Sequence, residues 1–91
     1  MVLVPEKARD LPDDEFGEGL SPINESEFAV LTWRERVIHI LDRETMTFSR
    51  KHTLPGEINE GWGITADESQ PDFKGCFPLY VSDGSDTIFK V

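Results

Sequence analysis

The acidic residue best placed to do chemistry is Glu18, which lies between two glycines in the string Phe16-Gly17-Glu18-Gly19-Leu20. Because glycine has no side chain, both neighbours let a ligand or another backbone come close and leave the carboxylate unshielded. A carboxylate in such a place can take a proton in one step and return it in the next. Judged alone, Glu18 is one of eighteen acidic residues, for which a solvated turn position is the ordinary interpretation.

Aromatic residues are the other candidates for a binding site. Flat indole rings, such as those of Trp33 and Trp62, can form walls that hold a flexible group in one conformation. Both tryptophans fall at the ends of apolar runs, where packing in the core is their commoner role. Phe16 is more typical of packing than of ligand contact.

The remaining reactive side chains receive no catalytic role. His39 lies in an apolar run and His52 in a charged one, and neither has a second metal ligand at a usable spacing. Cys76 is the only cysteine, so no internal disulfide can form. We expect no metal and no cofactor, and we interpret the following acidic cluster as part of a solvated linker because it lacks the spacing of a calcium loop: Asp10, Asp13, Asp14 and Glu15.

Composition limits the class of protein. With 91 residues the chain is one small domain at most, and its net charge of −9 argues against nucleic acid or an anionic membrane as partner. No stretch approaches eighteen apolar residues, and residues 1–5 are too short for a signal peptide. A hydrophobic content of 37% argues against disorder.

The elements expected to position these residues are strands. Residues 1–15, rich in proline and acid, are predicted to be a connecting segment, and residues 16–91 the folded part. Short runs rich in β-branched and aromatic residues alternate with turn residues, and no apolar set keeps a helical period, which predicts an all-β antiparallel meander. The runs are 19–20, 28–33, 37–41, 48–54, 62–65, 79–82 and 87–91.

A weak internal repeat organises these runs. Residues 29–40 can be laid on residues 80–91 with an offset of 51, and residues 18–21 on residues 62–65 with an offset of 44. The difference fits an insertion in the loop 66–78. A unit of about 40 to 50 residues with four strands is the size of a propeller blade, so the sequence predicts two blades, the second without its last strand. Propellers need about four to eight blades, which predicts that the chain is a piece or assembles with other blades.

Five ordered blocks carry a resemblance to a known family. They are Phe16 to Leu20, Leu31-Thr32-Trp33, Asp42 to Thr45, Gly61 to Asp67 and Tyr80 to Ser85. Together they resemble the plant and bacterial type of glutamine cyclotransferase from Phe16 to Val91, with a longer loop at residues 68–78. The segment Asp83-Gly84 within the last block is a hairpin turn signal, so we do not interpret Asp83 as a catalytic acid.

The resemblance implies a five-bladed β-propeller that converts the N-terminal glutamine of a peptide to pyroglutamate and releases ammonia without a metal. It implies Glu18 as the catalytic general acid and base, and Phe16, Trp33 and Trp62 as aromatic substrate-binding residues. It also implies a secretory or periplasmic location. Because other parts of the site would lie in further blades, we expect the isolated chain to be inactive and to associate with remaining blades or with itself.

The chemistry suits these residue types. Cyclisation needs a neutral α-amine, whereas an α-amino group has a pKa near 7.7 to 8.0 and is mostly protonated at pH 7. One carboxylate can take that proton and pass it to the departing amide nitrogen, which then leaves as ammonia. Aromatic walls can hold the glutamine side chain curled over its own amine. The alternative is a non-catalytic propeller fragment or interaction module that has kept the blade architecture alone.

Overall fold

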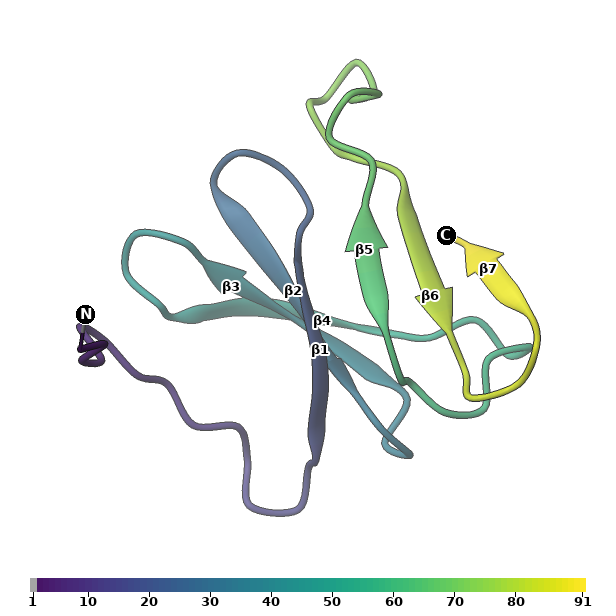
Figure 1. Ribbon diagram of the computed structural model, residues 1–91, viewed down its shortest axis with the longest axis horizontal. Helices are drawn as coiled ribbons and strands as arrows, with labels where there is room; N and C mark the ends of the chain where they lie inside the picture. The colour runs from purple at the N-terminus through teal and green to yellow at the C-terminus, as the bar shows by residue number, and fades with distance from the viewer. Residues whose placement is uncertain (1) are drawn as a thin grey trace.

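The computed structural model describes residues 2–91, and Met1 lies outside the described part. It contains strands and no helix, so no helix in this range is long and apolar enough to cross a membrane. The all-β prediction is therefore confirmed (Figure 1). The seven strands are β1 (Gly17–Pro22), β2 (Glu27–Thr32), β3 (Val37–Asp42), β4 (Phe48–Thr53), β5 (Ile64–Ala66), β6 (Leu79–Ser82) and β7 (Ile88–Lys90).

The strands form two antiparallel sheets in which chain neighbours are also sheet neighbours. The first sheet has the order β1-β2-β3-β4 and the second the order β5-β6-β7. The first strands of the two sheets, β1 and β5, contact each other. Figure 1 shows the second sheet beside the first, with the chain crossing between them after β4. Two meanders joined at their first strands are consistent with a partial propeller.

The internal repeat corresponds to matching strands. An offset of 51 carries β2 onto β6 and β3 onto β7, and an offset of 44 carries the second half of β1 onto β5. Residues 67–78 form the long connection between β5 and β6, where the sequence has its additional residues. Gly84 has a φ of 87°, as the hairpin predicted at Asp83-Gly84 requires.

The core lies against one face of β2 and β3, where Ala29 pairs with Ile40 and Leu31 with Ile38. Its fully or nearly fully buried apolar residues are Ile23, Ala29, Leu31, Ile38, Ile40, Leu54, Ile58 and Val81. The buried Thr32 at the end of β2 is satisfied locally, because its hydroxyl donates to the Val37 carbonyl at 2.6 Å and accepts the Val37 N–H at 3.0 Å. These bonds close the β2–β3 hairpin directly beside Trp33, one of the predicted site residues.

Arg36, in the β2–β3 hairpin, fixes the chain that crosses between the sheets. Its guanidinium donates to the carbonyl oxygens of Leu54, Pro55 and Ile58 at 2.9, 2.9 and 3.0 Å. The Leu54 N–H donates in return to the Arg36 carbonyl at 2.9 Å. Arg36 therefore ties the first part of the crossing segment 54–63 to the first sheet through both its side chain and its backbone.

The connecting segment has no strand between residues 2 and 16, but it is not wholly solvated as expected. The Glu15 carboxylate accepts hydrogen bonds from Nε2 of His39 at 2.9 and 3.0 Å, and the two side chains are only 11% and 9% exposed. The prediction of a solvated Glu15 is therefore wrong, because β3 presents a buried ring nitrogen that needs a partner. His39 is structural, and His52 is exposed, as expected.

Candidate functional site

Glu18 occupies an irregular position at the start of β1. Gly17 pairs with Thr32 and Gly19 with Leu31, so Glu18 is an additional residue with no partner on β2. It is exposed, and among the described residues its carboxylate makes no hydrogen bond or ion pair. Such a β-bulge turns a side chain out of the ordinary alternation of the strand and often lies next to an active site.

The glycine after Glu18 brings β1 against the second sheet. A Cβ atom on Gly19 would lie 2.9 Å from Cγ2 of Ile64 and 3.4 Å from the carbonyl oxygen of Trp62. Gly19, the residue after Glu18, therefore lies against the backbone that carries Trp62. The close approach expected from the glycines that flank Glu18 is present on the Gly19 side.

Trp33 follows β2 and is tied to both neighbouring chain segments. Its N–H donates to the Phe16 carbonyl at 3.0 Å, and its carbonyl accepts the Gly61 N–H at 2.7 Å. The rings of Phe16 and Trp33 meet edge to face, with centroids 6.1 Å apart and planes at 65°. The structure thus brings these two predicted aromatic residues together.

Trp62 lies two residues before β5 and remains 52% exposed. Its N–H donates to the Ser82 carbonyl at 3.1 Å, which joins it to the end of β6. Its indole lies so close to Gly84 that a Cβ atom there would be 2.5 Å from Cε2. The β6–β7 hairpin therefore supports one face of this ring.

Glu60 connects the two tryptophans, and sequence reasoning gave it no role. Oε2 of Glu60 accepts the indole N–H of Trp33 at 3.1 Å and that of Trp62 at 2.9 Å. Nε of Arg34 lies 3.5 Å from Oε1, and the Arg34 guanidinium stacks on the Trp33 ring at 4.1 Å. The hydrogen bonds from Trp62 and Trp33, with a smaller effect of Arg34, lower the pKa of Glu60.

The internal repeat contains a signal that could have found Glu60. The offset of 44 places Glu60-Gly61-Trp62-Gly63 on Phe16-Gly17-Glu18-Gly19. Glu18 and Trp62 are thus equivalent positions in the two units, and so are Phe16 and Glu60. The glycine-flanked motif occurs twice, with its acidic and aromatic residues exchanged.

Three of the four predicted residues are linked near the junction of β1 and β5, because Phe16 contacts Trp33 and both tryptophans bond to Glu60. Glu18 lies at the bulge in β1, next to Gly19, and its side chain makes no hydrogen bond or ion pair with them among the described residues. The arrangement is an exposed carboxylate at the start of β1 and a second carboxylate bonded to the two indoles. Such a site can move a proton at a small group held against aromatic surfaces. A model of the glutamine cyclotransferase family matches residues 4–91.

The chain belongs to the glutamine cyclotransferase family. The expected resemblance is confirmed, and the match to the cyclotransferase model begins at residue 4, so it includes most of the connecting segment as well as the blocks from Phe16 onward. None of the curated proteins compared with the chain matches it.

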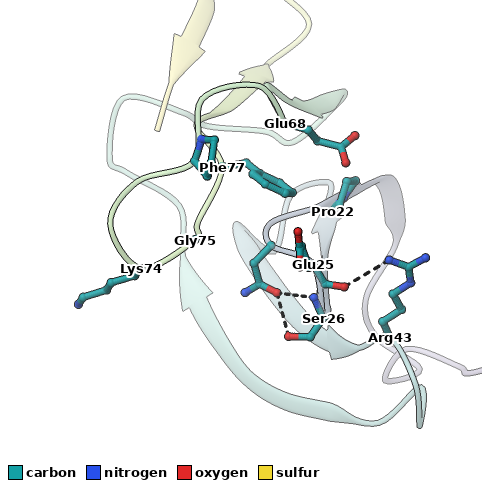
Figure 2. Close-up of a pocket in the computed structure, with 10 residues that line it drawn as sticks. Pro22, Glu25, Ser26, Arg43, Glu68, Lys74, Gly75 and Phe77 are labelled. Carbon is teal, nitrogen blue, oxygen red and sulfur yellow. Dashed lines mark hydrogen bonds between the residues drawn. The ribbon is translucent and has the colours of Figure 1, made fainter.

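A cavity of about 620 Å³ lies at the other end of the first sheet, beyond the end of β1 at Pro22 (Figure 2). Some of the polar groups that line it bond to one another. Arg43 donates to the Glu25 carbonyl at 3.3 Å, and Ser26 bonds Oδ1 of Asn24 through its N–H at 2.8 Å and its hydroxyl at 3.0 Å. Figure 2 shows Lys74 pointing away from this cavity, which leaves the β1–β5 junction as the better candidate site.

The ionisable groups around the tryptophans bond to one another rather than forming a cluster of metal ligands. Within residues 2–91, no three side chains of His, Cys, Asp or Glu form a group that could hold a metal ion. Beside the indoles lie the Glu60 carboxylate and the Arg34 guanidinium, which contact each other and the rings. Among the described residues near this junction, the Glu18 carboxylate has no hydrogen-bond or ion-pair partner, whereas the Glu35 carboxylate accepts the Phe16 N–H at 2.8 Å.

Proposed function

We propose that the chain provides part of the active site of a glutaminyl-peptide cyclotransferase, with Glu18 as general acid and base. The observation that carries this proposal is the exposed Glu18 carboxylate at a β-bulge whose next residue, Gly19, packs against the backbone of Trp62, in a chain of the cyclotransferase family. The substrate is a peptide that begins with glutamine. No cofactor takes part.

The reaction exchanges one carbon–nitrogen bond for another. Glu18 accepts a proton from the α-ammonium group, and the neutral amine attacks the side-chain amide carbon. A bond forms between the α-nitrogen and that carbon, and the bond from the carbon to the amide nitrogen breaks. Glu18 returns its proton to the departing nitrogen, which leaves as ammonia, and the ring nitrogen gives its second proton to that ammonia, so the products are a neutral pyroglutamyl peptide and ammonium.

The aromatic residues hold the glutamine for ring closure. Trp33 and Trp62 provide two indole surfaces, and Phe16 lies against the edge of Trp33. Ring closure within one residue is fast when the side chain is already curled over its own amine, so walls that restrict its conformations lower the barrier. The exposure of Trp62 leaves room for a substrate at this face.

We propose further that the site is completed by additional blades. One four-stranded and one three-stranded sheet do not close a ring, and a propeller is built from about four to eight such sheets. The exposed edges of the two sheets are where further blades, or a second copy of the chain, would pair. We expect little activity from these two sheets alone.

The test of this function is Glu18→Gln, which keeps the shape of the side chain and removes its ability to carry the proton. Turnover, measured as ammonia release from a glutaminyl peptide by the chain together with its further blades, should fall by about 10² to 10⁴-fold. The KM should change little. Thermal melting of the same protein monitors folding.

The matched control is Glu57→Gln, which changes an exposed carboxylate in the crossing segment and should leave turnover unchanged. Near-normal turnover in a folded Glu18→Gln protein would remove Glu18 from the mechanism. Absence of ammonia release from every assembly with intact Glu18 would overturn the function itself, and a non-catalytic propeller module would then be the better interpretation.

A further inference from the structure

The two indole N–H groups of the chain converge on a single atom. Trp33 comes from the end of the first sheet and Trp62 from the start of the second, yet both donate to Oε2 of Glu60, at 3.1 and 2.9 Å. These are the only two tryptophans in the sequence. The arrangement therefore adds a side-chain link between the two sheets to the backbone bond from Gly61 to Trp33.

We propose that Glu60 is a positioning residue that fixes both indole walls of the site relative to each other. The inference rests on the proposed function, because it assigns the walls to the glutamine substrate. An indole ring on a half-exposed side chain can turn about two torsions, and one hydrogen bond from its only donor removes much of that freedom. Sharing one acceptor makes the orientation of Trp33 depend on that of Trp62.

Arg34 orients the carboxylate that makes this link. Its Nε lies 3.5 Å from Oε1, the oxygen not used by the indoles, while its guanidinium covers the face of Trp33 at 4.1 Å. The planar group thus contacts Glu60 and Trp33 together. Substrate then meets Trp33 on the surface that Arg34 leaves uncovered.

Glu60 is poorly suited to carry the proton itself. An oxygen of a carboxylate has two lone-pair directions, and both indole bonds already use Oε2. The hydrogen bonds favour the charged form and lower the pKa of Glu60, which makes its carboxylate a weaker proton acceptor. The two glutamates of the site therefore divide the work, with proton transfer at Glu18 and alignment of the walls at Glu60.

The first test is spectroscopic and needs no activity. A proton–nitrogen correlation spectrum of the chain should contain two indole signals, assigned by Trp33→Phe and Trp62→Phe. A hydrogen bond to a carboxylate deshields the donated indole proton. Removing the acceptor in Glu60→Ala should therefore move both indole signals upfield. Glu57→Ala, in the same crossing segment, should move neither.

The spectrum also shows whether the variant is folded, through the dispersion of its backbone amide signals. If Glu60→Ala does not fold, Glu60→Gln replaces it in the test. Its amide oxygen is a weaker acceptor than the carboxylate, so both indole signals should move upfield by a smaller amount. An unmoved indole signal in a folded Glu60→Ala protein, or in Glu60→Gln where that variant decides, would overturn the shared anchor.

The second test measures catalysis with the further blades in place. Glu60→Ala should lower kcat/KM by about 10 to 100-fold, as expected for misaligned walls, with partial recovery in Glu60→Gln. The pH profile should keep its shape, because Glu18 still carries the proton. Moved indole signals with unchanged kcat/KM would overturn the positioning role, whereas loss of the proposed function would show as inactivity of the unsubstituted protein.

Discussion

The indole ring of Trp62 lies directly against Gly84, so that a Cβ atom at residue 84 would be 2.5 Å from Cε2 of the ring. Gly84 is thus constrained twice, by its φ of 87° and by the aromatic ring. Gly75 has a similar φ of 84°, but a Cβ atom there would meet nothing within 4 Å. The two glycines separate the effect of backbone conformation from that of contact with Trp62.

We predict that Gly84→Ala destabilises the chain more than Gly75→Ala. The left-handed conformation alone costs an alanine about 1 to 2 kcal/mol, which both variants share. Only Gly84→Ala must also displace Trp62, which should change the tryptophan fluorescence of the native state. Urea unfolding followed by fluorescence gives both quantities. Equal losses of stability and unchanged fluorescence would contradict the contact.

The buried pair of Glu15 and His39 gives a second prediction. Glu15→Ala leaves Nε2 of His39 without its partner, and the His39 side chain is only 9% exposed. The loss should lower the free energy of unfolding by about 1.5 to 3 kcal/mol. Residues 2–14 should also be cleaved faster in limited proteolysis, because this bond holds them to β3. Asp13→Ala, at an exposed position, should change stability by less than about 0.5 kcal/mol. A Glu15→Ala protein that matches this control would refute the prediction.

Lowering the pH should reduce the folding stability of the chain through the protonation of Glu27. Arg50 donates to its carboxylate at 2.7 Å, and this bond, followed by that from Asn24, lowers the pKa of Glu27 below its ordinary 4.5. A group whose pKa is lower in the folded state stabilises it above the unfolded pKa, and the gain disappears as pH falls through the folded value. The stabilisation by Glu27 is therefore present at pH 7 and lost progressively as the pH falls below about 4.5.

The comparison uses Glu27→Gln, with unfolding by urea at pH 7 and at pH 3. At pH 7 the variant should be less stable by up to about 1 kcal/mol, a modest effect because Arg50 is half exposed. At pH 3 the difference should be smaller, since the stabilisation is lost as the pH falls through the lowered pKa of Glu27 in the folded state. A difference that stays the same at both pH values would show that the pair does not contribute through its charge.

The strands follow from local sequence. Apolar runs such as residues 28–33 alternate with turn residues, and this pattern fixes strand order in a meander because neighbours in the chain pair with each other. The repeat with an offset of 44 aligns Glu60 with Phe16 and so marks its position, but it does not predict what Glu60 does. Its role depends on two indoles from different sheets meeting at one oxygen, and spacing along the chain does not report such convergence. The burial of Glu15 likewise depends on a ring presented by β3.

The bulge at Glu18 is a further feature outside local pattern reasoning. The glycines on either side predict close approach, but the loss of one pairing partner depends on how β1 registers with β2. The sequence therefore predicted that the Glu18 carboxylate is accessible, but it did not predict the bulge at which Glu18 lies.

The three carbonyl bonds of Arg36 determine where the chain could be opened without harm to the site. New termini in the β3–β4 hairpin, at residues 43–46, would leave the crossing segment attached to the first sheet by Arg36. New termini between Leu54 and Glu60 would free one half of that segment from the guanidinium, and with it the backbone that leads to Glu60. A circular permutant cut at the first place should keep the shared acceptor of the two indoles, whereas one cut at the second should lose it.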